Sequence, residues 1–204
     1  MKKNKINFSF KQPTAKFLFH LNGGASLNIQ NSILDLMEVA SETFITTDTS
    51  SNSSHSNFQI QNSTVLNSAN CFFYAAKTSV CDSIIIDKSN FTSNNGVIFN
   101  LQQEDDKKGY YPVEKIIITN SNFTKLNGQI VTLLRSGRDE STMGPKFIYT
   151  YNKVVECNTA ASDGLITLNG VQFSNIEKNI FEKSNAKKKV IIYKGKMMKL
   201  LPSI

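Results

Sequence analysis

The segment Ile116-Ile117-Ile118-Thr119-Asn120-Ser121-Asn122-Phe123 decides the fold, because versions of it return along the chain. Each version has an apolar run, then Asn or Ser, then one large apolar residue. The other five copies occupy residues 27–33, 58–65, 84–91, 147–154 and 171–181. A repeat of this length is typical of stacked architectures, in which each unit packs only on its neighbours.

The apolar runs predict strands rather than helices. They are short and rich in β-branched and aromatic residues, and no segment sustains a helical apolar period. The runs 84–86 and 116–118 show no polar alternation, which favours parallel strands covered on both faces. A second short strand, usually after a Gly or Asn, is expected at 97–99, 130–134, 164–168 and 190–193.

The order of strand, Asn-Ser turn, apolar residue, Gly bend and strand predicts an all-β fold. It indicates a single-stranded right-handed parallel β-helix of about six coils, a solenoid of the pectin lyase type. Asn and Ser tolerate the unusual backbone of the turn, and Asn side chains can pair from one coil to the next. We expect one domain at 17–195, with an N-terminal lead-in at 1–16 and a C-terminal tail at 196–204. The N-terminal end has no obvious cap, which suggests that more coils or another domain precede it.

The basic composition suits an anionic partner, although a solvated Lys-rich surface accounts for most of the lysines. The net charge is +7 and comes mostly from Lys, since Arg135 and Arg138 are the only arginines. Most aromatic residues are Phe within apolar runs, which suits a core better than a stacking platform for bases, so nucleic acid is not expected as a partner. No stretch is apolar enough to span a membrane, so no membrane partner is expected. No signal peptide is evident, because Lys11, Pro13 and Lys16 interrupt the N-terminal segment.

The cysteines indicate neither a disulfide framework nor a zinc site. There are three, Cys71, Cys81 and Cys157, without CxxC spacing. Each stands near an apolar run and is predicted to be a small buried hydrophobe, although a Cys71–Cys81 bridge stays open.

The segment 133–146 carries the most chemical information. It leaves a strand, brings four charged residues within six positions, and ends in Gly-Pro before the next strand. Clustered Arg beside carboxylates can recognise carboxylate or sulfate groups through bidentate hydrogen bonds. The alternative is an internal network that braces a long loop. The candidate substrate-binding residues are Arg135, Arg138, Asp139, Glu140 and Lys146.

At this segment the chain resembles the alginate lyase and chondroitinase B family of polysaccharide lyases, family 6. The resemblance is carried by Arg135-Ser136-Gly137-Arg138-Asp139-Glu140-Ser141-Thr142-Met143-Gly144-Pro145. Ser136 stands where that pattern has Gly, and Arg138 where it has Asn. Residues 19–27 and 168–176 are also similar to that family, and the resemblance spans roughly 17–195.

The resemblance implies the C-terminal β-helix domain of a larger, periplasmic or extracellular lyase. The family's catalytic domain, with its calcium site, Lys base and Arg acid, would lie upstream. No match to that constellation is found here, so no catalytic residue, metal ligand or cofactor is assigned to this chain. The implied partners are an acidic polysaccharide such as alginate or chondroitin, the upstream catalytic domain and a second copy in a homodimer.

Two alternatives remain open, so the enzyme assignment stays uncertain. One is a complete small lyase that cleaves by β-elimination without a metal, using Arg135, Arg138, Lys146 and Tyr149. The other is a structural or adhesive β-solenoid without a glycan ligand.

Overall fold

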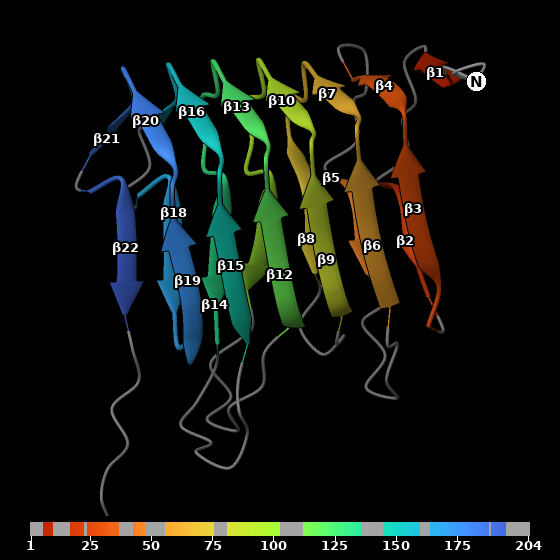
Figure 1. The fold of residues 1–204 in the computed structure, drawn as a ribbon. Helices are drawn as coiled ribbons and strands as arrows, with labels where there is room; N and C mark the ends of the chain where they lie inside the picture. The colour runs from red at the N-terminus through yellow and green to blue at the C-terminus, as the bar shows by residue number, and fades with distance from the viewer. Residues whose placement is uncertain are drawn as a thin grey trace, which may run out of the picture.

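The chain winds through a stack of coils whose strands line up in parallel sheets (Figure 1). The computed structural model describes residues 6–9, 17–22, 24–36, 43–47, 56–75, 81–102, 112–135, 145–159, 164–187 and 189–194. These residues contain strands, turns and bends but no helix.

Three large sheets form the walls of the stack. Sheet A has the order β1 (Ile6–Ser9), β4 (Ser32–Asp35), β7 (Thr64–Leu66), β10 (Asn90–Thr92), β13 (Asn122–Thr124), β16 (Lys153–Val155) and β20 (Ile180–Glu182). Sheet B has the order β2 (Phe17–Leu21), β5 (Thr43–Thr47), β8 (Cys71–Ala75), β11 (Phe99–Gln102), β14 (Val131–Leu134), β18 (Ile166–Asn169) and β22 (Ile191–Lys194). Sheet C has the order β19 (Phe173–Glu177), β15 (Lys146–Thr150), β12 (Val113–Thr119), β9 (Cys81–Asp87), β6 (Ser56–Gln61) and β3 (Ser26–Gln30). A small two-stranded sheet joins β17 (Asn158–Thr159) to β21 (Asn185–Ala186).

The predicted parallel β-helix is confirmed. A typical coil runs from sheet C through sheet A to sheet B, and every strand pairs in parallel with its counterpart in the next coil. The coil count differs slightly from the expected six, because sheet C has six strands while sheets A and B have seven each. Strand β1 lies within the range 1–16 that was set apart as a lead-in, and it pairs with β4 of sheet A.

Each coil has one more strand than the sequence pattern indicated. The large apolar residue after the Asn-Ser turn lies in a short strand of sheet A rather than in a turn. Phe91 of β10 and Phe123 of β13 are partners in register, and their rings stack with centroids 5.3 Å apart. Similar rows from sheets B and C meet these rings inside the coil, and together they form one continuous core.

A buried row of Ser and Asn side chains fixes the turn between sheets C and A. Its members are Ser32, Ser63, Ser89, Ser121, Asn152 and Asn179. The backbone N–H of each donates to the side-chain oxygen of the next, at 2.8 to 3.3 Å. The four serine hydroxyls also donate to the carbonyl two residues earlier, at 2.7 to 2.9 Å. The row therefore satisfies polar groups that the turn would otherwise bury without partners.

The residue before each member of this row has positive φ. These residues are Asn31, Asn62, Lys88, Asn120, Tyr151 and Lys178. The predicted pairing of Asn side chains occurs between the first two, where Asn62 Nδ2 donates to Asn31 Oδ1 at 2.6 Å. Further along, Asn120 Nδ2 donates to Asp87 Oδ1 at 2.9 Å instead. Asn suits the left-handed conformation, which explains its recurrence in the sequence motif.

The cysteines are free, so the Cys71–Cys81 bridge that the sequence left open is not formed. Cys81 and Cys157 are fully buried, and Cys71 is partly buried. Burial raises the pKa of Cys71 and of Cys81 to about 12. Both therefore remain protonated at neutral pH and pack as small hydrophobes.

Candidate functional site

The structure places Arg135 in the wall of the coil. It directly follows β14, and its backbone N–H donates to the carbonyl of Asn169 at 3.0 Å. Its side chain is only 4% exposed, so it does not project from the surface. Three other predicted ligand-binding residues, Arg138, Asp139 and Glu140, lie outside the described residues.

Lys146 has the opposite environment. It is the first residue of β15 in sheet C and is exposed. In the neighbouring strands Lys115 and Phe173 are its partners in register. The two described members of the predicted site therefore belong to different sheets, one buried and one open to solvent.

A buried polar network on sheet B was missed by the sequence analysis. Gln129 Nε2 donates to the carbonyl of Gly164 at 2.9 Å and to Thr167 Oγ1 at 3.4 Å. Thr132 Oγ1 donates to Gln129 Oε1 at 3.0 Å. All three side chains are less than a tenth exposed, so the network holds successive coils together. The available signal was a single Thr in each of the apolar runs 130–134 and 164–168.

Tyr149 cannot act in catalysis, although the alternative of a complete small lyase requires it to do so. Its side chain is fully buried between the rings of Phe123 and Phe147, with centroids 6.1 and 6.0 Å away. Its hydroxyl has no hydrogen-bond partner among the described residues. Burial raises the pKa of Tyr149 well above its usual value, so the phenol stays protonated. It can neither reach a substrate nor serve as a base.

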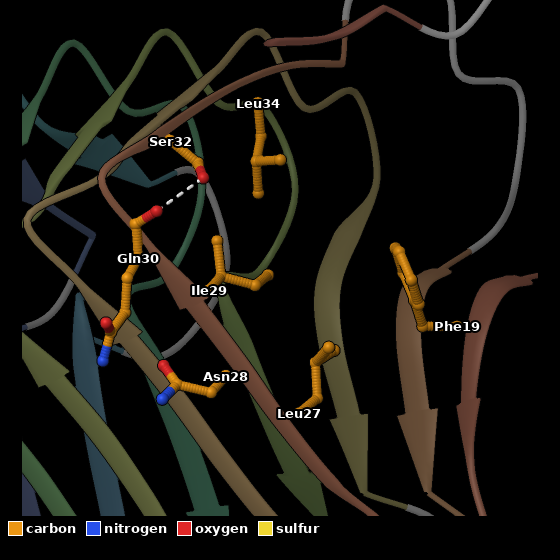
Figure 2. Close-up of a pocket in the computed structure, with 7 residues that line it drawn as sticks. All are labelled: Phe19, Leu27, Asn28, Ile29, Gln30, Ser32 and Leu34. Carbon is orange, nitrogen blue, oxygen red and sulfur yellow. Dashed lines mark hydrogen bonds between the residues drawn. The ribbon is translucent and has the colours of Figure 1, made fainter. Parts of the chain in front are cut away.

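A pocket lies at the first coil, between side chains at the end of the apolar core (Figure 2). It has a volume of about 320 Å³ and is lined by Phe19, Leu27, Asn28, Ile29, Gln30, Ser32 and Leu34. The apolar members come from one strand of each large sheet, and β3 is the terminal strand of sheet C. Ser32 Oγ donates to the Gln30 carbonyl at 2.8 Å, as part of the buried turn row. The pocket thus offers apolar contact and no titratable group.

Within the described ranges no three His, Cys, Asp or Glu side chains lie close enough to hold a metal ion together. Nor does the described part of the chain contain a helix that could cross a membrane.

Comparison with known proteins finds similarity among solved structures. No family model matches the sequence, and no curated protein matches it. A mutant of the PL6 family alginate lyase AlyGC superposes with a TM-score of 0.77 at 24% identity, covering 97% of this chain and 32% of that one. AlyGC itself superposes with a TM-score of 0.69 at 24% identity, covering 88% of this chain and 30% of that one. This chain thus spans about a third of the length of the lyase, and it has the parallel β-helix fold found in that polysaccharide lyase.

Proposed function

We propose that this chain is a non-catalytic, glycan-binding β-helix domain of a polysaccharide lyase that acts on acidic uronate polymers such as alginate or chondroitin. The observation that carries the proposal is the superposition on an alginate lyase, which takes in 97% of this chain but 32% of the lyase. The motif at 135–145 independently points to the same family. The base, acid and calcium of the reaction would come from an upstream catalytic domain. The protein would act in the periplasm or outside the cell.

The charge of the chain supports an acidic glycan as its ligand. A net charge of +7 attracts a polymer whose sugars carry carboxylate or sulfate groups, and the attraction weakens as salt is added. Such binding alone would bring the substrate to an attached catalytic domain, because it raises the local concentration of substrate there. The domain would also support its catalytic neighbour or present a face to a second copy.

The chemistry of β-elimination explains why binding rather than cleavage is proposed. The proton α to a uronate carboxylate becomes acidic enough only when the carboxylate charge is neutralised and a base is held beside it. Among the residues named for a metal-free reaction, Arg135 and Tyr149 are buried. Lys146 alone among the described members is exposed.

Two measurements on the purified chain test this function. Incubation with alginate and with chondroitin sulfate, with and without calcium, is expected to give no rise in the ultraviolet absorbance of the unsaturated product. Calorimetric titration with alginate oligosaccharides is expected to show binding, and a neutral dextran none. Turnover would favour the complete small lyase, while absence of binding to any acidic polymer would favour a purely structural solenoid.

A further inference from the structure

The outer face of sheet C carries a row of residues suited to an acidic sugar chain. Lys115 of β12, Lys146 of β15 and Phe173 of β19 follow one another in register across three strands. Lys146 is exposed, Lys115 is partly exposed, and the side chain of Phe173 is 52% exposed. Adjacent strands lie about 4.8 Å apart, so the three side chains form a short continuous line along the stack.

The two ammonium groups of this row are available to a ligand. The side chains of Lys115 and Lys146 make no hydrogen bond or ion pair with another described residue. Other lysines differ: Lys153 lies 3.3 Å from a carboxylate oxygen of Glu182. Glu114 precedes Lys115 in β12 and offsets part of its charge, so Lys146 is the stronger of the two.

The rest of this face confines an anion to the lysine row. The next row along the strands contains Ile117 and Ile148, both partly exposed, which offer an apolar floor. Apart from Glu114, carboxylates come one row further, close to the turn, where Asp87 accepts a hydrogen bond from Thr119 at 3.0 Å and Glu177 lies at the end of β19. A polyanion is therefore attracted to one edge of the face and repelled from the other.

We propose that Lys115, Lys146 and Phe173 form a binding row for an acidic glycan that runs along the stack, across the strands of sheet C. The ammonium groups would bind carboxylates or sulfates of the polymer, and the Phe173 ring would pack against the apolar face of a sugar. This inference rests on the proposed function, because it names the surface on which the glycan binds. It also places the main contact on sheet C instead of on the charged segment 135–140.

Calorimetric titration of the full chain with alginate oligosaccharides tests the row. The double variant Lys115→Ala/Lys146→Ala is expected to bind about tenfold more weakly, and Phe173→Ala about fivefold more weakly. The double variant should also lose part of the salt dependence of binding. Lys146→Glu is expected to abolish binding, because it places a carboxylate in the centre of the row.

Matched controls come from sheet A. Lys153→Ala removes one positive charge elsewhere, against two in the double variant, and Ile180→Ala removes an apolar side chain that is also 52% exposed. Both are expected to bind within about twofold of the unchanged chain. A circular dichroism spectrum and a urea midpoint for each variant show that the coils are intact.

The outcomes separate this inference from the proposed function. If the unchanged chain binds alginate and the three row variants bind equally well, the row is wrong and the proposed function stands. If the unchanged chain binds no acidic polymer, both are wrong. Weakening in the row variants alone supports both.

Discussion

Asn152 occupies the position that serine holds in the four preceding coils. Its Oδ1 accepts the N–H of Ser121 at 2.9 Å, and its Nδ2 donates to the carbonyl of Ile118 at 2.9 Å. Asn152→Ala leaves both buried groups unpaired and is expected to lower the free energy of unfolding by about 2–4 kcal/mol. Asn152→Ser should recover roughly half of that loss, because a serine hydroxyl accepts the same N–H in the other coils. Urea unfolding measures both changes, and equal losses would contradict the role given to the buried row.

Replacing Tyr149 is expected to raise the free energy of unfolding rather than lower it. Its buried hydroxyl lacks a partner among the described residues, so it lost its hydration without forming a hydrogen bond. Tyr149→Phe is expected to raise the free energy of unfolding by about 1 kcal/mol. Tyr193→Phe is the matched control, since the hydroxyl of Tyr193 donates to the carbonyl of Val171 at 2.8 Å and its loss should be mildly destabilising. Thermal unfolding of both variants decides the matter, and destabilisation by Tyr149→Phe would show that this hydroxyl has a partner after all.

At the scale of single elements, position 128 must be glycine, because two backbones approach each other closely there. A Cβ added there would lie 2.4 Å from the carbonyl oxygen of Gly96, in the coil before. Gly128→Ala is expected to lower the free energy of unfolding by more than about 2 kcal/mol, although Gly→Ala in an open position usually stabilises. The exposed neighbour Asn95 supplies the control, and Asn95→Ala should change stability by less than about 0.5 kcal/mol. Similar urea midpoints for the two variants would mean that the coils can move apart at little cost.

Some strands of the β-helix could be predicted from the sequence, and others could not. The strands of sheet C and the last four strands of sheet B were predicted, because runs such as Ile116-Ile117-Ile118 are short and rich in β-branched residues. The first three strands of sheet B were not predicted. The run 116–118 was expected to be covered on both faces, but Ile117 is partly exposed, because only alternate residues point into the core. The strands of sheet A were missed, because β10 and β13 are three residues long and bury a single residue each. So short a segment has no period to read, and only its pairing with the next coil makes it a strand.

The candidate site was predicted less well than the fold. Arg135 was grouped with a charged loop because charge normally marks solvent exposure, yet it directly follows β14 and is buried in the wall. Lys146 was expected at the end of the loop, but it is the first residue of β15. Its neighbours Lys115 and Phe173 are 31 and 27 residues away in the chain. Such a row depends on the register between coils, which the unequal loop lengths hide from a single sequence.

At the scale of the whole molecule, stability should vary along the stack. Each coil contacts only its neighbours, so local opening is governed by how well a given coil is buried. The inward residues Ile116 and Ile118 of β12 and Phe123 of β13 are fully buried, whereas β19 and β20 contain no fully buried side chain. Opening of β19 and β20 therefore exposes less additional apolar surface and costs less free energy.

Hydrogen exchange followed by mass spectrometry should resolve this difference. Peptides covering 171–187 are expected to exchange at least about tenfold faster than peptides covering 113–124, which corresponds to about 1.4 kcal/mol in opening free energy. Gly128→Ala provides an internal comparison, because it loosens the middle of the stack and should bring the two rates closer together. Equal protection of both regions in the unchanged chain would show that the coils open as one cooperative unit. In that case nearest-neighbour packing would not describe the stability of this β-helix.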